Sequence, residues 1–386
     1  MQRYDSRRGC SRLNSGQLNS GQLTTLKLSC LMFAWLLGFV GVRASDHVRL
    51  MAKILSPSRS LTASLVQTPC VEDPAADGRM EWKSYTTSPR LRKGRFGGLF
   101  GAALSMRIYY PKAKTTKWPL VVVAHGFASS SKQHRTQARY LASRGYVAIA
   151  PDFANGILGL NPNHWRNADD INTVVEWALN ETKGEGAKGE ESQLFGIIDH
   201  VKPMVGAIGH SAGGFAVLLA AAKKDTRIKA VALMDPVGDK AGRGLKDLRK
   251  IRCASAVTYS PASPCNDPKR DDIDEASAVE LYDNLRAKPR RKILILNSYH
   301  LDGQDPPLGK TSPWLRPFVR RACEGISTEF CRKLYRRYTF GWLDYYLKDK
   351  ETQLRVKPYV FRTRNRDEGL AHDLDSGLLG DYIQSG

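Results

Sequence analysis

A serine flanked by glycines, with apolar runs on both sides of it, most constrains the fold of this 386-residue chain. Ser211 lies within 206–214 (GAIGHSAGG), directly after the apolar stretch 201–205 and before 213–224, whose small residues predict a helix. Another apolar run, 228–234, follows. Strand, turn, helix and strand in this order predict a parallel sheet. The glycines permit the sharp turn that lifts a nucleophilic hydroxyl clear of its own backbone.

The other patterned segments extend this alternation of strands and helices. The continuous β-branched run at 119–124 (PLVVVA) predicts a strand that is buried on both faces, as strands of parallel sheets are. We expect 291–297 to be the last strand. The remaining patterns predict strands at 145–152 and 254–259, and helices at 137–143, 169–179, 275–286 and 330–348.

Three segments of the chain resemble one group of α/β-hydrolases. They are 125–127 (HGF), 141–151 (LASRGYVAIAP) and 209–214 (GHSAGG), and the group contains chlorophyllases, polyester (PET) hydrolases and platelet-activating-factor acetylhydrolases. The resemblance covers about residues 83–350. It implies an α/β-hydrolase domain over 81–350, with a mostly parallel central sheet flanked by helices and an insert after the last strand. The resemblance is specific for the group and for no single substrate.

The resemblance also implies a catalytic triad in the chain order serine, acid, histidine. Ser211 is the expected nucleophile. Asp235 is the preferred acid, because it follows the strand at 228–234 and the carboxyl ends of parallel strands carry functional side chains. Its Asp-Pro-Val context resembles that of the chlorophyllases. Asp267, one strand later, is the alternative, because the polyester hydrolases carry their acid at that point.

His300 is the expected general base, which takes the proton of Ser211 while the acid orients its ring. The segment 298–302 (SYHLD) resembles the H-x-D segment of chlorophyllases. Asp302 is expected to anchor this loop rather than to act as the acid. His372, in the polar C-terminal part, is a weaker rival for the base.

The oxyanion donors follow from the two glycine-containing turns. In this group the loop that begins His-Gly supplies one backbone N–H, and the residue after the nucleophile supplies the other. The donors would therefore be the N–H groups of Phe127 and Ala212, which together provide a few kcal/mol of transition-state stabilisation. The ring of His125 is expected to be structural.

The resemblance predicts a serine carboxylic ester hydrolase that acts through an acyl-enzyme on a lipophilic ester, as chlorophyllases and PET hydrolases do. One alternative is a secreted lipase, cutinase or phospholipid acetylhydrolase. Another, of a different class, is a catalytically inactive hydrolase fold that serves as a binding protein. The sequence contains no H-x-x-H or C-x-x-C spacing, so we expect neither a metal nor any other cofactor.

The N-terminal part predicts entry into the secretory pathway. Residues 28–42 form an apolar run too short for a comfortable membrane span, and the sequence around Ala44 suits signal peptidase, so 1–44 reads as a signal peptide or an uncleaved signal anchor. The leader 45–80 contains a basic stretch, 47–67, without Asp or Glu, which is typical of a transit peptide. A two-part plastid address and plain secretion both remain open. Residues 351–386 read as a C-terminal tail.

Charge and cysteines suggest partners and cross-links. The formal net charge is +21, which favours contact with an anionic membrane surface, whereas no recognition motif supports nucleic-acid binding. The insert 303–330 reads as a lid or as a pocket wall. Local disulfides Cys253–Cys265 and Cys323–Cys331 are the natural pairs, with Cys70 left over. Basic residues gather beside the insert at Arg316, Arg320, Arg321, Arg332, Lys333, Arg336 and Arg337.

Overall fold

The computed structural model describes nine parts of the chain, which belong to one compact unit, Val71–Gly386. The signal segment 1–44, the leader up to residue 70 and the alternative acid Asp267 lie outside the described residues, as does most of the insert 303–330. The described residues are 71–92, 102–113, 117–153, 163–186, 189–239, 241–266, 277–306, 323 and 328–385.

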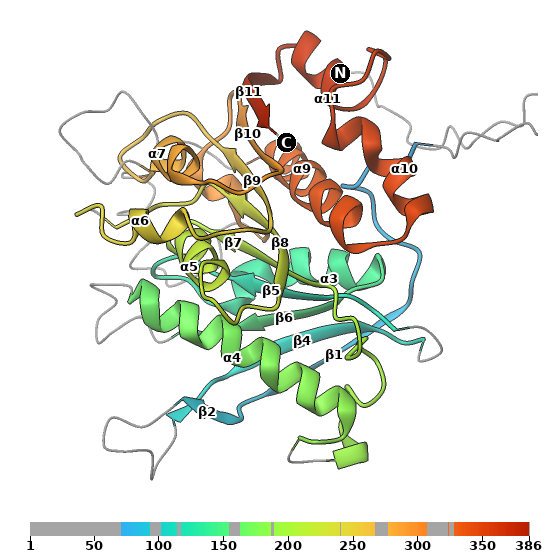
Figure 1. The fold of residues 1–386 in the computed structure, drawn as a ribbon. Coiled ribbons are helices and arrows are strands. Elements are labelled where there is room, and N and C mark those ends of the chain that lie inside the picture. The colour runs from blue at the N-terminus through green and yellow to red at the C-terminus, as the bar shows by residue number, and fades with distance from the viewer. Residues whose placement is uncertain are drawn as a thin grey trace, which may run out of the picture. The chain divides into compact units, whose positions relative to one another are not determined.

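A central sheet organises the described part of the chain (Figure 1). Its nine strands lie in the order β1-β4-β6-β5-β7-β8-β9-β10-β11, and the six from β6 to β10 pair in parallel. β1, β4 and β11 pair antiparallel at the two edges. The strands are β1 Trp82–Thr87, β4 Met106–Pro111, β5 Leu120–Ala124, β6 Val147–Pro151, β7 Val205–His210, β8 Ile228–Met234, β9 Ala254–Tyr259, β10 Arg290–Ile295 and β11 Leu379–Ser385; β2 Arg90–Arg92 and β3 Ala102–Ala103 form a separate pair.

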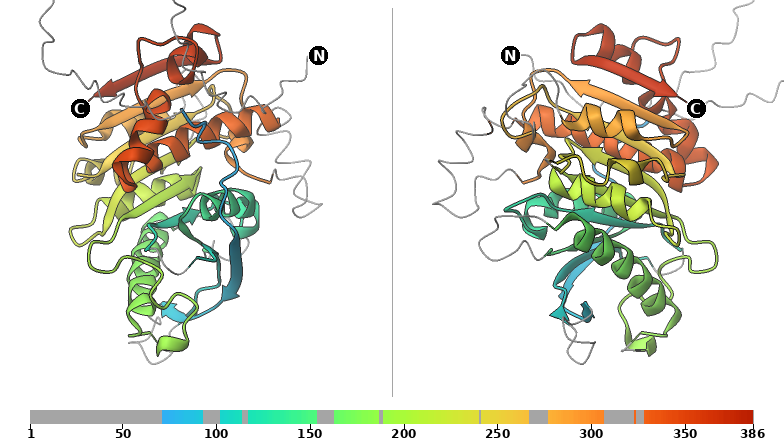
Figure 2. Two further views of the ribbon diagram at one scale, coloured as in Figure 1. Left: turned by 90° about the vertical axis from the view of Figure 1, so that its right-hand side faces the viewer. Right: turned by 60° about the vertical axis from the view of Figure 1, so that its left-hand side comes forward.

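Helices cover both faces of the sheet, as the two turned views in Figure 2 show. One apolar core lies between the sheet and α4, α5, α6 and α7, and a second lies between the sheet and α3, α9, α10 and α11. This arrangement explains why every residue of β5, β6 and β7 is buried. The helices are α3 Arg135–Ser143, α4 His164–Lys183, α5 Ala212–Ala221, α6 Leu245–Leu248, α7 Ser277–Asn284, α9 Glu329–Leu347, α10 Lys350–Val360 and α11 Gly369–Asp375, with 3₁₀ turns η1 Ser131–His134, η3 Gly189–Glu191 and η4 His300–Gly303.

Capping side chains fix the ends of the long helices. The Asn163 side chain accepts a hydrogen bond from Arg166 N at the start of α4, and Gly184 ends that helix in the left-handed conformation. Thr328 caps α9 by accepting from Cys331 N. α9 packs along the sheet with a row of buried aromatic side chains, so its aromatics belong to the core.

Three details of the sequence interpretation are wrong. The folded unit begins at Val71 rather than at residue 81, so the end of the predicted leader belongs to it, and Asp73 there lies 2.8 Å from Arg337. The strand before Ser211 is Val205–His210 rather than 201–205, because the Lys-Pro pair at 202–203 interrupts that run and the glycine-containing segment itself is extended. β10 is not the last strand: the segment 351–386, read as a tail, contains α10, α11 and β11, and β11 pairs antiparallel with β10. Register pairs such as Lys292 with Ile383 make this segment an edge of the main sheet.

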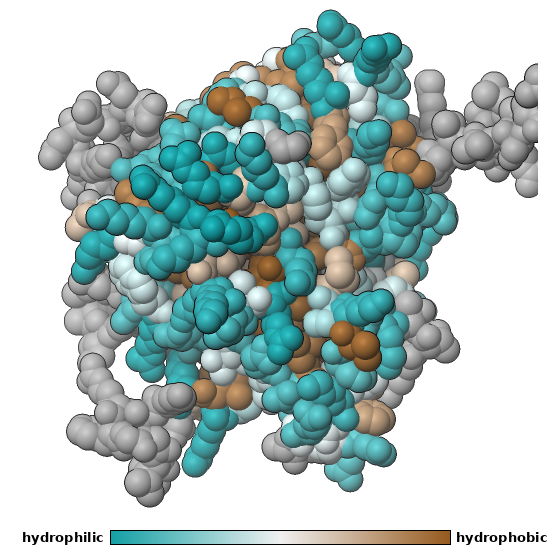
Figure 3. Space-filling model, in the orientation of Figure 1, coloured by the Kyte–Doolittle hydropathy of each residue, from teal (hydrophilic) through white to brown (hydrophobic). Residues whose placement is uncertain are grey.

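One face of the unit is largely polar. Figure 3 shows hydrophilic side chains over most of one face, with apolar residues in small, separate spots. Among the described residues, no helix has both the length and the apolar character that crossing a membrane requires. The apolar run 28–42 is outside that part of the chain.

Candidate active site

Ser211 occupies a strained turn between β7 and α5. Its φ of 55° and ψ of −130° form a backbone conformation that L-residues rarely adopt. Hydrogen bonds hold the turn on both sides: Ser211 N donates to Met234 O at 3.1 Å, and Ser211 O accepts from Gly214 N at 2.9 Å. This is the geometry of a nucleophile elbow, which presents the hydroxyl at the carboxyl edge of the sheet.

Three side chains from separate loops meet at this turn. Ser211 Oγ lies 3.0 Å from His300 Nε2, and His300 Nδ1 lies 3.1 Å from Asp235 Oδ2. Ser211 follows β7, Asp235 follows β8 and His300 begins η4 beyond β10, so all three lie past the carboxyl ends of parallel strands. The structure therefore brings together the three residues that the sequence analysis selects.

The rival residues lie elsewhere or outside the described chain. Asp267 is outside the described residues. His372 lies on α11, and its ring nitrogen Nδ1 is 3.3 Å from Asp373 Oδ1. Asp302 anchors the His300 loop as expected, because its carboxylate accepts from Tyr299 N at 2.9 Å and from Thr328 N at 3.0 Å.

Polar side chains from the loop after β9 surround the Asp235 carboxylate, which is fully buried. Ser260 Oγ donates to Asp235 Oδ2, and Asn266 Nδ2 lies 3.3 Å from both carboxylate oxygens. A buried carboxylate needs such donors, because moving it out of water costs several kcal/mol unless protein donors replace the lost water. Neither Ser260 nor Asn266 carries a signal in the sequence, because both reach Asp235 through the path of an irregular loop.

Two backbone amides in the turns around Ser211 have no hydrogen-bond acceptor in the described protein. Within the described part of the chain, neither Phe127 N nor Ala212 N donates a hydrogen bond to protein. Two glycines let their segments approach: a Cβ on Gly126 would lie 2.9 Å from Ser211 Cβ, and one on Gly213 would lie 2.4 Å from His125 O. The close contact places both expected oxyanion donors at one turn.

The His125 ring does more than fill a turn. Its Nδ1 lies 2.8 Å from Gly126 O, and its Nε2 accepts a hydrogen bond from Phe153 N at 2.9 Å. The second contact fixes the proton on Nδ1, which then donates to the carbonyl of the Gly126–Phe127 peptide. Since that peptide also carries the Phe127 N–H, the ring orients an expected oxyanion donor. The sequence interpretation of this ring as merely structural misses that contact.

Other buried histidines near the elbow are held neutral. His210 Nε2 lies 2.8 Å from the backbone oxygen of His300, which ties the base loop to β7. Burial, with a smaller contribution from His300, lowers the pKa of His210 well below its ordinary value. Burial also lowers the pKa of His134 to about 4 and lowers that of His125. These rings therefore serve as hydrogen-bonding groups around the site rather than as titrating ones.

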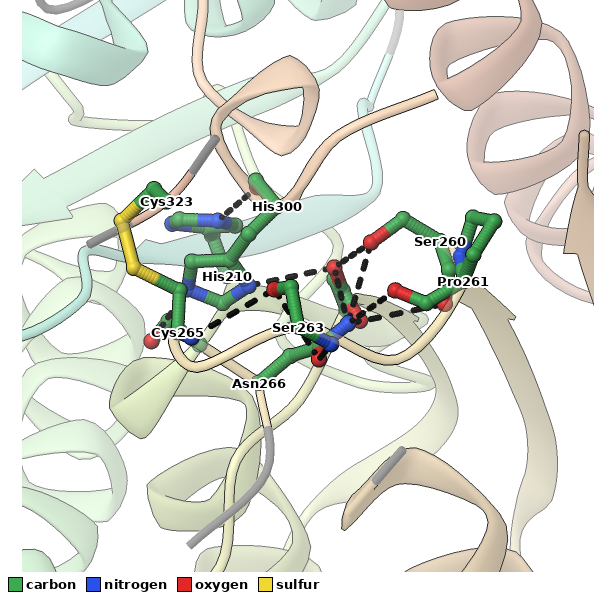
Figure 4. The surroundings of a disulfide bond; sticks show 10 residues. His210, Ser260, Pro261, Ser263, Cys265, Asn266, His300 and Cys323 are labelled. Carbon is green, nitrogen blue, oxygen red and sulfur yellow. Dashed lines mark hydrogen bonds and ion pairs between the residues drawn. A yellow bond between two sulfur atoms is a disulfide. The ribbon is translucent and has the colours of Figure 1, made fainter. Parts of the chain in front are cut away.

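The cysteines pair differently from the sequence prediction. The disulfide joins Cys265 to Cys323, with Cα atoms 4.9 Å apart, and Cys253 and Cys331 are free thiols. Cys253 precedes β9, whereas Cys265 stays beside Ser260 at the other end of this strand, which is about 20 Å long. The Cys323–Cys331 pair is also wrong, since Cys331 lies inside α9 with its thiol 3.4 Å from Asn297 O. Figure 4 shows the disulfide beside His300 and Asn266.

The described basic residues beside the insert are paired with acids. Arg332 and Arg336 contact Glu329, and Arg336 also contacts the buried Asp305. Arg337 lies 2.8 Å from Asp73, and Lys333 lies 3.6 Å from the same carboxylate. The guanidinium groups of Arg336 and Arg337 are largely buried in these ion pairs, whereas Lys333 is 46% exposed, and contact with an anionic surface stays a prediction.

No group of three or more His, Cys, Asp or Glu side chains that could hold a metal ion occurs among the described residues. The neighbours of Ser211 supply a hydrogen-bonded imidazole and a buried carboxylate, and the backbone amides of Phe127 and Ala212 lie in the two adjoining turns. That set fits nucleophilic attack on a carbonyl carbon.

Comparison with known families agrees with this chemistry. The model of the S15 peptidase family, described as X-Pro dipeptidyl-peptidase, matches residues 101–292, a segment that includes Ser211 and Asp235 and ends before His300. No curated protein matches the chain. The fold is that of the α/β-hydrolases, and the match supports a serine hydrolase in general. The match is to the S15 peptidases, and it does not confirm the finer resemblance to chlorophyllases and PET hydrolases.

Proposed function

We propose that the chain is a serine hydrolase that cleaves carboxylic esters through an acyl-enzyme. The observation that carries this proposal is the continuous hydrogen-bonded series from Ser211 through His300 to Asp235, beside two backbone N–H groups. Each element of acyl transfer has a residue here: nucleophile, base, orienting acid and oxyanion donors.

In the first half-reaction Ser211 Oγ attacks the ester carbonyl carbon. His300 Nε2 takes the hydroxyl proton, and Asp235 stabilises the imidazolium through Nδ1. The negative charge that develops on the carbonyl oxygen is met by the N–H groups of Phe127 and Ala212. The tetrahedral intermediate collapses when His300 returns the proton to the leaving alcohol, which leaves the acyl group on Ser211.

In the second half-reaction water releases the acyl group. His300 takes a proton from the water, whose oxygen attacks the acyl carbon, and the same two amides bind the second oxyanion. The proton then returns to Ser211 Oγ as the carboxylic acid leaves. The relay ends in its starting state, so each turnover consumes one ester and one water.

Exposed aromatic rings near the elbow support a lipophilic substrate. Phe127 is 43% exposed and Trp165 is 37% exposed, although large aromatic side chains are usually buried. The neighbouring His164 ring contacts Phe215 at 5.0 Å and approaches Ala212 O at 3.4 Å, which ties Trp165 to the turn. Esters of the chlorophyllase or PET hydrolase kind, and the lipids of lipases, cutinases and phospholipid acetylhydrolases, all fit this description.

A second candidate activity is removal of X-Pro dipeptides, and the match to the S15 family favours it. The same nucleophile, base and oxyanion donors hydrolyse amides as well as esters. Such an enzyme would also need an anionic group that binds the free α-ammonium of its peptide. The two candidates therefore differ in what lies beside Ser211, and not in the triad.

One experiment separates these candidates. The full chain and its Ser211→Ala variant are assayed on p-nitrophenyl butyrate and on Gly-Pro-p-nitroanilide. We expect the ester to turn over at least 100-fold faster than the anilide, and both activities to vanish in Ser211→Ala. Preference for the anilide would make the protein a dipeptidyl-peptidase. Absence of both, with no labelling by a fluorophosphonate probe, would indicate an inactive binding fold.

The proposed location is the secretory pathway, as the basic leader and the apolar run 28–42 predict. The Cys265–Cys323 disulfide supports it, since disulfides persist in oxidising compartments. A fluorescent protein fused after residue 80 tests the idea, and label confined to the cytosol would reject it. Label in a plastid rather than the medium would favour the two-part address.

A further inference from the structure

The loop between β9 and α7 gives the Asp235 carboxylate a hydrogen-bond donor that does not belong to the triad. Asn266 is fully buried, and its Nδ2 group lies 3.3 Å from both Asp235 oxygens and 3.0 Å from Pro261 O. Its Oδ1 accepts from Ser263 N at 2.7 Å. Every polar atom of this amide is therefore engaged, and its donor group is directed at the carboxylate (Figure 4).

This loop is cross-linked to the segment that follows His300. Cys265, the residue before Asn266, forms the disulfide with Cys323, across 58 residues of sequence. Backbone contacts hold the loop as well: Asn266 N donates to Ser263 O at 3.1 Å, and Ser277 N donates to Asn266 O at 2.9 Å. The disulfide is thus the covalent link between the loop that contacts the acid and the chain beyond the base.

We propose that Asn266 is a positioning residue for Asp235 and that the Cys265–Cys323 disulfide holds it in place, so that the reactivity of Ser211 depends on the oxidation state of this pair. The proposal rests on the proposed serine hydrolase function. Asn266 touches no reacting atom; it acts by fixing the carboxylate that orients His300.

The reasoning is electrostatic and geometric. A carboxylate with no exposure must take its hydrogen bonds from protein, and here Ser260, Asn266 and His300 supply them. If the Asn266 amide withdraws, the carboxylate can rotate toward its remaining donors, and its bond to His300 Nδ1 weakens. The imidazolium that forms during attack by Ser211 is then less well stabilised.

Reduction would release the tether. A dithiol gives two electrons and two protons to the disulfide, which becomes the two thiols of Cys265 and Cys323 while the dithiol becomes a cyclic disulfide. Cys265 is partly exposed, so a small dithiol can reach its sulfur, whereas Cys323 is buried. The remaining described cysteines, Cys253 and Cys331, are already thiols and do not change.

The test measures how fast a fluorophosphonate probe labels Ser211, because this rate reports nucleophile activation without any assumption about the natural substrate. The full chain is compared with and without dithiothreitol, and with its Cys265→Ser/Cys323→Ser variant. We expect the reduced protein and the double variant to label about tenfold more slowly than the oxidised protein, at an unchanged dissociation constant for the probe. Equal rates would overturn the role of the disulfide.

Variants at Asn266 test the positioning role directly. Asn266→Ala is expected to lower the labelling rate about 10- to 100-fold, as removal of a hydrogen bond to a charged group does. Asn266→Asp keeps the side-chain shape but loses the donor, so it should label no faster than Asn266→Ala. If Asn266 only fills space, Asn266→Asp should instead label faster than Asn266→Ala. The matched control is Asn284→Ala, which removes an amide bonded to Glu280 O on α7.

Coupling distinguishes positioning from general damage. In an Asp235→Asn background, Asn266→Ala should have less than a twofold further effect, because the carboxylate that it positions is gone. In Asn266→Ala, dithiothreitol should likewise have little effect. If the oxidised full chain does not label at all, the proposed function fails. If it labels and these couplings are absent, only the present inference fails. Should Asn266→Ala not fold, the dithiothreitol comparison on the unaltered chain still decides.

Discussion

The nucleophile side of the site, formed by Ser211, Phe127 and Ala212, is built from backbone, whereas the acid side, formed by Asp235, Ser260 and Asn266, is built from side chains. On the first side, strained φ/ψ angles and two glycines fix the atoms that act. On the second, Asp235 also has a positive φ, of 46°, but its buried carboxylate depends on side-chain donors from the next loop. Backbone geometry can be predicted from glycines that are close together in the sequence, whereas side-chain contacts between separate loops have no such local pattern.

The largest expected effect tests the acid side. Asp235→Asn replaces a hydrogen-bond acceptor with an amide that can hold the wrong tautomer of His300, so we expect kcat for p-nitrophenyl butyrate to fall about 10⁴-fold. Asp267→Asn is the matched control, one strand later in the chain, and should remain within twofold of the unaltered protein. If the two variants exchange these phenotypes, the acid is Asp267 and the acid side is assigned to the wrong loop.

The nucleophile side should be sensitive to a single methyl group. A Cβ at Gly213 would lie 2.4 Å from His125 O and 2.6 Å from Ala124 O, and backbone atoms cannot yield cheaply. Gly213→Ala should separate β5 from α5 and cost about 10²- to 10³-fold in kcat, as loss of an oxyanion donor does.

Gly238→Ala provides the comparison for that variant. The atoms nearest to a Cβ at Gly238 belong to side chains, of which the closest is Leu281 at 3.2 Å, so this change should be nearly neutral. Kinetics of both variants, measured with their melting temperatures, check the expectation. If Gly213→Ala leaves kcat unaltered, catalysis does not depend on the close contact between the segments that contain Phe127 and Ala212.

The next effect concerns the one place where a side chain supports the nucleophile side. His125→Phe keeps a ring of similar shape but loses the bonds to Gly126 O and Phe153 N. We expect kcat to fall about 10- to 100-fold with little change in KM, because the Phe127 N–H is no longer oriented for the transition state. His125→Asn retains a donor near the position of Nδ1 and should recover part of the loss. Equal activity of the two variants would make the ring a packing group.

The difference between the two sides also explains which parts of the fold and site can be predicted from the sequence. The strands 228–234 and 254–259 are predicted with the bounds that the structure has, because buried parallel strands are mostly apolar and rich in β-branched residues. Ser211, Asp235 and His300 follow such strands, so their meeting could be anticipated. Asn266 could not, since its role depends on an irregular loop path. β11 was missed because its partner β10 lies more than 80 residues earlier, with no hairpin turn between them.

The disulfide illustrates the same limit. Cysteines near one another in sequence seemed natural pairs, yet an extended strand carries Cys253 away from Cys265. The true partner, Cys323, is distant in sequence and close in space only because the loops after β9 and β10 adjoin at the carboxyl edge of the sheet. Pairing is therefore a property of the tertiary fold.

The last expected effect is on stability rather than on kcat, and it belongs to the nucleophile side, where the buried histidines lie. Burial lowers the pKa of His134 from 6.5 to about 4. Between these values the unfolded chain binds a proton that the folded protein excludes, so the free energy of unfolding falls as the pH drops from 6.5 to 4. For His134 alone the loss is roughly 3 kcal/mol at pH 4. His125 and His210, whose pKa values are also lowered, add to it.

Urea unfolding at several pH values between 7 and 4 measures this slope, and His134→Gln should reduce it because the amide cannot take up a proton. His372→Gln, at an exposed histidine on α11, is the matched control. Three hydrogen-bond donors surround the Asp235 carboxylate on the acid side, whereas the His134 ring bonds to Gln137 through Nδ1 and its Nε2 has no partner among the described residues. Burial without a second partner therefore disfavours the protonated form of the His134 ring. A slope that survives His134→Gln unchanged would place the acid sensitivity elsewhere in the fold.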